Sequence, residues 1–258
     1  MLRRTFISLT IALLSLLPGF AYAFVAPDDT TKSVTAVPPC DSTVTAVPAV
    51  IHPVIGLSTN LLYDITYIPN LGVTSIPSLG IEFYPAKGHW TFGADVDWSH
   101  WRNYSEHRYN QIHNITLSTR RYFNPSGTYT AKRRDVNNPA VTGFAGLYLA
   151  GNLNAAQYGL GWNAHGWEGE GLGASLGIGY KWFFNHRIYL DLGVAAGFFY
   201  SRYDPYVWGD DSTGWYYYDY NGEPADFVRR RMALNWFGPT RAYISLGINL
   251  FERNRSKK

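Results

Sequence analysis

Aromatic rings and carboxylates gather in one stretch of the sequence, residues 201–238. Its candidate ligand-binding residues are Trp208, Trp215, Tyr216 and Tyr218. Around these rings lie five aspartates: Asp204, Asp210, Asp211, Asp219 and Asp226. Rings stack on the apolar faces of sugars and carboxylates accept hydrogen bonds from hydroxyl groups, so the stretch predicts a surface site for glycans. The alternative is that the rings fold the loop over its own support or lie among lipid headgroups.

A second candidate group consists of six charged residues: Glu82, Asp95, Asp97, Arg120, Lys181 and Asp191. Each occurs where small or polar residues alternate with bulky apolar ones, so all six lie on the polar face of their segments. Buried charges must be paired, and both signs are present. The pattern therefore predicts a network of ion pairs. An ion path or a catalytic pair of carboxylates is the alternative.

Other residues that often carry chemistry occur without a matching pattern. The basic run Arg229–Arg231 could bind the phosphates of lipopolysaccharide. The alternative is that it is exposed to solvent or pairs with carboxylates of the loop. His100, His107 and His113 match no zinc spacing. The sequence contains no G-x-S-x-G, Walker or Rossmann motif. We therefore expect no catalytic residue, no cofactor and no metal. A lipid- or glycan-modifying enzyme built on the loops is the alternative.

The composition is that of a β-rich chain with little soluble surface. Only 16% of the 258 residues are charged, against roughly 25% in a typical soluble domain. Aromatic residues reach 17%, and there are 25 glycines. The formal net charge of +3 is too small to indicate a nucleic-acid partner. The one cysteine, Cys40, excludes an intramolecular disulfide.

The two ends of the chain have patterns of their own. Residues 1–23 predict a cleaved secretory signal peptide, with a basic start, an apolar run and the small-residue site Ala21–Ala23. Residues 24–53 repeat Val-Thr-Ala-Val-Pro and predict a flexible Thr/Pro/Val linker. Residues 252–258 form a charged tail. No later stretch is a candidate transmembrane helix, so we expect an exported chain without a helical anchor.

Between residues 54 and 251, apolar residues alternate with small or polar ones at a period of two, which indicates β-strands. The clearest case is the hairpin over Gly171–Tyr200, which turns at Asn185-His186. Eight strands are predicted, at about residues 54–64, 79–84, 90–99, 110–123, 141–154, 171–184, 187–200 and 240–251. Longer loops are predicted at residues 102–109, 157–170 and 201–238. Most of the strands approach the roughly 9–11 residues that cross a bilayer when tilted.

Alternation alone does not decide which face of the sheet points outward. A soluble lipocalin-like carrier also alternates, but it keeps its apolar face inside and needs a charged exterior. Here the other face is mainly Gly, Ser, Thr and Asn, which suit the crowded interior of a narrow barrel. Aromatic residues at strand ends, such as Trp90, Trp98, Trp182 and Tyr200, resemble the girdles of outer-membrane barrels. The sequence therefore predicts an all-β fold, an eight-stranded antiparallel transmembrane β-barrel in the outer membrane. Outer-membrane lipid and lipopolysaccharide would surround it, and the carrier is the alternative.

Four short motifs carry a resemblance to a known family: Asn60–Asp64, Pro77–Phe83, Arg120–Phe123 and Phe237–Arg241. Over about residues 54–251 the chain resembles a domain-of-unknown-function family of small outer-membrane β-barrels, often encoded beside fimbrial genes. The resemblance implies a non-enzymatic structural or surface-binding role associated with fimbriae. It implies fimbrial subunits as partners and brings no catalytic residues to this chain. Surface glycans are the partner that the aromatic and acidic residues in the stretch 201–238 predict.

Overall fold

The computed structural model describes residues 50–68, 72–86, 88–103, 107–123, 144–162, 164–185, 187–209, 212, 214–226 and 230–255. By its contacts the chain divides into two units, residues 1–47 and 48–258. The predicted signal peptide, the predicted linker up to residue 49 and Cys40 lie outside the described residues. The helices and strands that the structure describes belong to the second unit.

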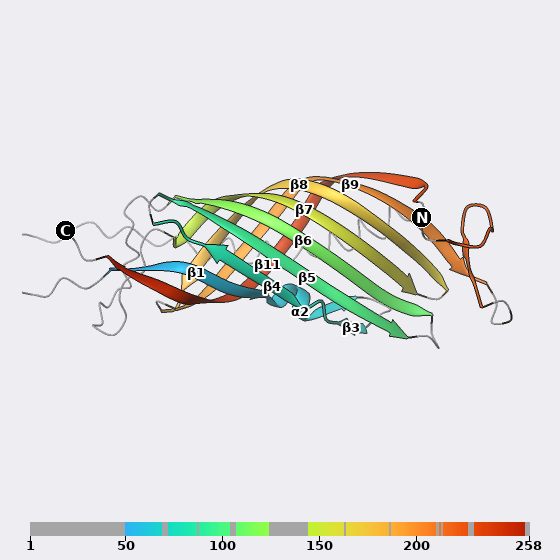
Figure 1. Cartoon of the computed structure of the whole chain (residues 1–258), viewed down its shortest axis with the longest axis horizontal. Coiled ribbons are helices and arrows are strands. Elements are labelled where there is room, and N and C mark those ends of the chain that lie inside the picture. Colours follow the sequence, from blue (N-terminus) through green and yellow to red (C-terminus); the bar gives the residue numbers. More distant parts are fainter. Residues whose placement is uncertain are drawn as a thin grey trace, which may run out of the picture. The chain divides into compact units, whose positions relative to one another are not determined.

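Eight antiparallel strands pair edge to edge and close into a ring (Figure 1). They are β1 (Val50–Asn60), β4 (Ser78–Phe83), β5 (Trp90–Asn103), β6 (Arg108–Tyr122), β7 (Gly146–Trp162), β8 (His165–Phe183), β9 (Ile188–Trp208) and β11 (Met232–Arg255). Because β11 pairs with β9 on one side and with β1 on the other, it closes the ring. The expected all-β antiparallel sheet of eight strands is confirmed.

Three short strands add to the ring. The strand β10 (Tyr216–Tyr218) pairs with the far end of β9. The strands β2 (Thr66–Ile68) and β3 (Gly72–Thr74) form a separate hairpin. We call the end of the ring that carries β10 the β10 end. The opposite end, where tight connections join β4 to β5 and β8 to β9, is the turn end.

The bulky apolar side chains lie on the outer face of the ring, and the small and charged ones face its interior. On β8, Leu172 and Leu176 are exposed to 66% and 77%, whereas Ser175 and Lys181 are buried. The other strands expose the same kind of side chain: Leu79, Ile81, Phe83, Phe92, Val96, Ile115, Leu117, Leu149, Leu153, Leu192, Val194, Phe198, Ile244, Leu246, Ile248 and Leu250. The alternation of faces predicted from the sequence is confirmed on these strands.

Three loops were predicted too long, because the strands continue past their apolar alternation. The predicted loop at 157–170 is a hairpin, since β7 runs to Trp162 and β8 begins at His165. Its described turn residue, Ala164, has a φ of 66°. The loop at 102–109 shrinks in the same way between β5 and β6, and much of 201–238 belongs to β9, β10 and β11. Glycines at 159, 161, 166 and 169 carry no side chain, so the period of two is not legible there.

The wall of the ring is short at β1 and β4. The strand predicted over 54–64 ends at Asn60, and Leu61–Asp64 form one helical turn, α2. The Asn60 side chain accepts a hydrogen bond from Leu62 N at 3.2 Å and so caps this turn. The strands β1 and β4 pair only from Ile55 to Ser58. No helix in the described part of the chain is long and apolar enough to cross a membrane.

Candidate functional site

Four of the six predicted charges meet inside the ring, toward the turn end. We call Glu82, Arg120, Lys181 and Asp191 the inner charge cluster. Lys181 Nζ, on β8, contacts Glu82 Oε2, on β4. Arg120 Nη1, on β6, lies 3.2 Å from the same Glu82 oxygen and 2.6 Å from Asp191 Oδ2, on β9. Two cations and two anions therefore join four strands, and their formal charges cancel.

Tyrosines surround the inner charge cluster and satisfy its remaining acceptors. Tyr148 donates to Asp191 Oδ1 at 2.5 Å, and Thr91 donates to Glu82 Oε1 at 2.6 Å. The hydroxyls of Tyr84 and Tyr122 donate to the two oxygens of Glu82 at 3.0 and 3.2 Å. The rings of Tyr84, Tyr122, Tyr148 and Tyr189 are almost fully buried. Charges, hydroxyls and rings together fill this section of the interior.

Glycines on neighbouring strands make room for these rings. A Cβ at Gly247, on β11, would lie 2.1 Å from Cζ of Tyr189. A Cβ at Gly193, on β9, would lie 2.3 Å from Cζ of Tyr243. The small residues were predicted to suit a crowded interior, but the tyrosines that occupy the space beside them were not predicted. The signal was present, because each glycine stands beside an inward-facing tyrosine on the paired strand.

The other two predicted charges lie in a second layer, nearer the β10 end. Asp95 Oδ2 accepts a hydrogen bond from Arg241 Nη1 at 3.0 Å and lies 3.0 Å from Arg241 Nη2 in the same ion pair. Asp97 Oδ2 accepts from the Asn114 amide at 2.6 Å. Asp64, on α2, accepts from Ser78 N at 3.1 Å and from the Thr59 hydroxyl. The six charges therefore fall into two layers rather than one network.

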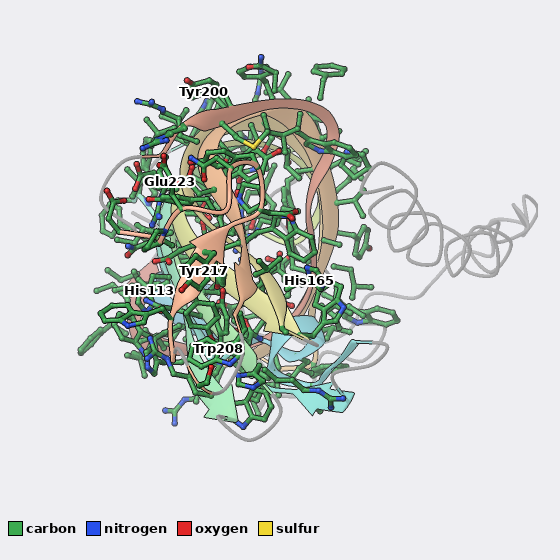
Figure 2. All side chains as sticks on the ribbon, turned by 90° about the vertical axis from the view of Figure 1, so that its right-hand side faces the viewer. His113, His165, Tyr200, Trp208, Tyr217 and Glu223 are labelled. Atoms are coloured by element: carbon green, nitrogen blue, oxygen red, sulfur yellow. The ribbon has the colours of Figure 1, made fainter. Side chains whose placement is uncertain are left out.

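The four candidate aromatic residues lie at the β10 end, since Trp208 (labelled in Figure 2) ends β9, Tyr216 and Tyr218 belong to β10 and Trp215 directly precedes it, but they are not equivalent. The rings of Trp208, at the end of β9, and Tyr216, on β10, meet edge to face at 4.5 Å. Trp215 is 65% exposed. Tyr218 is buried, and its hydroxyl donates to Asp226. Only Trp215 therefore presents most of its ring to an outside ligand.

A row of residues that the sequence analysis missed crosses four strands at this end. Register places Tyr109, Gly161, Gly166 and Tyr206 side by side on β6 to β9. The two tyrosine rings lean over the two glycines and stack at 5.9 Å. Burial raises the pKa of the Tyr206 hydroxyl, and the neighbouring Tyr216 raises it further. The row therefore packs two tyrosine rings over the glycines of the hairpin between β7 and β8.

The basic run near β11 divides in two. Arg230 is buried, and its guanidinium lies 3.2 Å from Glu168 and 3.8 Å from Asp204. Arg231 is half exposed, and its guanidinium carbon lies 5.4 Å from the centre of the Tyr218 ring. Arg229 lies outside the described residues. Of the two arginines described, Arg231 is the one an outside phosphate can reach.

Within the described ranges, no three His, Cys, Asp or Glu side chains gather in a way that could hold a metal ion. The histidines serve other contacts. His113 stacks on Trp98 at 3.9 Å, and His107 stacks on Trp208 at 4.8 Å. Both pairs lie toward the β10 end, where β5 begins to project past β4.

A family model described as protein of unknown function DUF3575 matches residues 40–250. The chain belongs to this family. The match covers the whole ring from β1 almost to the end of β11, and it supports the resemblance to a family of unknown function seen in the sequence. No curated protein and no solved structure matches the chain significantly.

Proposed function

We propose that this DUF3575 protein is an eight-stranded transmembrane β-barrel of the outer membrane. Its outer face carries the proposal. In water, each fully exposed leucine or phenylalanine forgoes about 1.5–3 kcal/mol of burial free energy. Here such side chains lie on the outer face of most strands of the ring. A continuous apolar face of this kind marks a surface that contacts lipid or another apolar partner.

Closure of the sheet supports the same proposal. In a bilayer every backbone polar group must be hydrogen-bonded within the protein, and a closed antiparallel ring does this over the section where all eight strands pair. The turn end would face the periplasm and the β10 end the cell exterior, because long hairpins project on the outer side of such barrels. The predicted signal peptide agrees with export but lies outside the described residues.

For the role of the barrel, we propose a non-enzymatic structural or surface-binding function associated with fimbriae. The filled inner section supports a closed barrel rather than a pore, since paired charges and buried rings occupy it. The exposed ring of Trp215 and the half-exposed Arg231 support a surface contact with glycans or lipopolysaccharide. The fimbrial association rests on the family resemblance.

The two alternatives have less support. A soluble lipocalin-like carrier would hide its apolar face inside, whereas here that face is exposed. An enzyme acting on lipids or glycans would need a nucleophile and base within hydrogen-bond reach. The carboxylates of the inner charge cluster are instead held by cations and tyrosines.

Fractionation of a strain that produces the full chain tests the proposed location. We expect the protein in the outer-membrane fraction, with faster gel migration of unheated than of heated samples, because a closed barrel resists detergent until it is heated. Recovery in the soluble periplasmic fraction would refute the proposal. A change in the lipid or surface-glycan profile of a deletion strain, restored by complementation, would favour the enzyme instead.

A further inference from the structure

A β-bulge on β11 exchanges the faces of that strand. Pro239 pairs with Ala196 and Arg241 with Ala195, so Thr240 is an extra residue in the ladder. On the turn side of the bulge, even-numbered residues such as Ile244 and Leu246 point outward. On the β10 side the odd-numbered Phe237 takes the outer face, opposite Phe198. The bulge therefore turns the even-numbered Trp236, Leu234 and Met232 toward the interior.

Register confirms the inward orientation of these three residues. Trp236 pairs with Phe199, Leu234 with Ser201 and Met232 with Tyr203. Directly paired residues share one face of an antiparallel sheet. The Phe199 ring lies against the α-carbons of Gly171 and Gly173, where an added Cβ would come within 3 Å of it. On β8, those two glycines alternate in phase with Ser175 and Lys181, which face the interior.

The result is a mainly apolar inner face in the β10 half of the ring, which we call the upper inner face: Phe199, Tyr203, Met232, Leu234 and Trp236. Ser201 lies between them, but it is buried and its hydroxyl is already bonded to Glu170 O and to the Tyr158 hydroxyl. The upper inner face differs from the turn half, where the interior is filled. Leu234 is 43% exposed and Met232 is 38% exposed, although both point inward. The layer of Asp95 and Arg241 bounds this face below. An apolar molecule can therefore lie against the upper inner face but cannot pass the charged layers.

The same strand leaves its second edge unpaired. Beyond Ser245, which pairs with Asn60, β11 is bonded to β9 alone among the strands that the structure describes. The Asn60 side chain accepts from Ile244 N at 3.1 Å and donates to Ala242 O at 3.5 Å. The helical turn α2 contacts β11 next to it, but no described strand pairs with this edge from Ile244 to Met232. The edge next to Phe237 lies level with Phe198, within the apolar outer face. The lipid-facing exterior and the upper inner face thus meet along one unpaired strand edge.

We propose that the upper inner face binds the acyl chain of a membrane lipid, which enters along the unpaired edge of β11. This inference rests on the proposed outer-membrane function. Three observations select an acyl chain: the face is apolar and aromatic, it is continuous with the outer apolar face, and it is closed below by charges. A wholly polar solute would find few partners on this face, because its side chains offer mainly hydrocarbon.

Thiol protection tests the proposal at two neighbouring positions. The full chain carries Cys40→Ser, which removes its one cysteine, plus either Leu234→Cys on the inner face or Asn235→Cys on the outer face. The proteins are purified in a steroid-type detergent that supplies no acyl chain. A charged maleimide then labels each cysteine with and without palmitoyl lysophospholipid or palmitic acid. Heat-dependent gel migration checks that each variant has folded, and Trp236→Cys serves as a second inner position.

We expect the lysophospholipid to slow labelling at Leu234→Cys and at Trp236→Cys, by about tenfold at ten times its Kd. Labelling at Asn235→Cys should not change. Equal slowing at inner and outer positions, no slowing at all, or no labelling of the inner positions without lipid would each overturn the proposal. Protection by palmitic acid without protection by lysophospholipid would overturn the assignment to membrane lipid.

A further variant separates this inference from the proposed location. Leu246→Cys lies on the outer apolar face. In phospholipid nanodiscs it should resist the charged maleimide if the ring spans the bilayer. Labelling there would contradict the membrane proposal, whereas an unlabelled Leu246→Cys beside an unprotected Leu234→Cys would contradict the acyl-chain site alone.

Discussion

Lys181 reaches across the ring to Glu82. The two residues lie on β8 and β4, which are four strands apart in either direction around the ring. The contact therefore ties opposite walls together, while Arg120 ties the same glutamate to Asp191 on β9. The buried charges therefore form ion pairs that link strands on opposite sides of the ring across its interior.

Removal of one partner should cost much of the stability of the ring. Lys181→Met leaves Glu82 with one cation fewer in a buried position, and breaking a buried pair costs about 3–5 kcal/mol. We expect the free energy of unfolding to fall by that amount. Denaturant titration of the protein in lipid vesicles, monitored by tryptophan fluorescence, measures it. Arg121→Met is the matched control, because Arg121 is exposed and lies over the Trp90 ring. Equal losses of unfolding free energy for the two variants would show that the ion pair between Lys181 and Glu82 does not stabilise the ring.

The inner charge cluster should also keep the barrel closed. Arg120→Ala removes the guanidinium that lies between Glu82 and Asp191 and leaves the formal charge of the cluster at −1. In planar bilayers we expect rare openings for the unmodified protein and frequent, cation-selective openings for the variant, because the space gained is lined by carboxylates. Conductance that is unchanged, or selective for anions, would contradict this expectation. Arg202→Ala, at an exposed position on the outer face of β9, controls for general loosening of the fold.

Glycines beside tyrosines predict a steric effect that differs sharply between sites. A Cβ at Gly247 would lie 2.1 Å from the Tyr189 ring, whereas a Cβ at Gly151 would come no closer than 3.6 Å to Thr119. We expect Gly247→Ala to lower the free energy of unfolding by about 1–3 kcal/mol, as overpacking does. Gly151→Ala should change it by less than about 0.5 kcal/mol.

A double variant makes the Gly247 prediction specific to the ring of Tyr189. Adding Tyr189→Ala to Gly247→Ala removes the ring that the new methyl group meets. The combined loss should then be smaller than the sum of the two single losses, which a double-mutant cycle measures. Simple additivity would show that the loss at Gly247 arises elsewhere.

The number of strands, and which side chains of each strand point outward, could be predicted from the sequence for a physical reason. On β5 and β8, every second side chain points to the outer face and is apolar, as Phe92 and Val96 are on β5 and Leu172 and Leu176 on β8. The period of two is therefore visible in the sequence. The six charges could be placed inside for the same reason. Their partners could not be named, because Arg120, Glu82 and Asp191 come from three strands whose relative stagger depends on the closed ring.

The β10 end was harder to predict. Because Gly161 and Gly166 have no side chains, the sequence does not show which face of the sheet they occupy. The hairpin of β7 and β8 was therefore predicted as a loop. The candidate aromatic residues lie near one another because they are close in the sequence, but the sequence alone gave no way to see that Tyr218 is buried while Trp215 is exposed. The bulge at Thr240 was not visible, since the residues before it, Trp236-Phe237-Gly238-Pro239, contain no regular alternation.

Exposure separates the surface residues that can bind from those that support. Trp215→Ala should weaken binding of purified lipopolysaccharide from the producing strain while leaving the gel shift on heating unchanged, because the ring is 65% exposed. Tyr218→Phe should instead lower stability by about 0.5–1.5 kcal/mol, since it removes the hydrogen bond to Asp226. Surface plasmon resonance on immobilised lipopolysaccharide measures the first effect. Undiminished binding by Trp215→Ala would remove this ring from the candidate site.

Deletion of Thr240 should exchange the two faces of the β10 half of β11. Without the extra residue, Pro239 and Arg241 would follow one another in a regular ladder opposite Ala196 and Ala195. A one-residue change of register sends every side chain to the other face, so Leu234 would point outward and Asn235 inward. In the Cys40→Ser background, protection by palmitoyl lysophospholipid should then move from Leu234→Cys to Asn235→Cys. If protection stays at Leu234→Cys in a folded deletion variant, the bulge is not what forms the upper inner face.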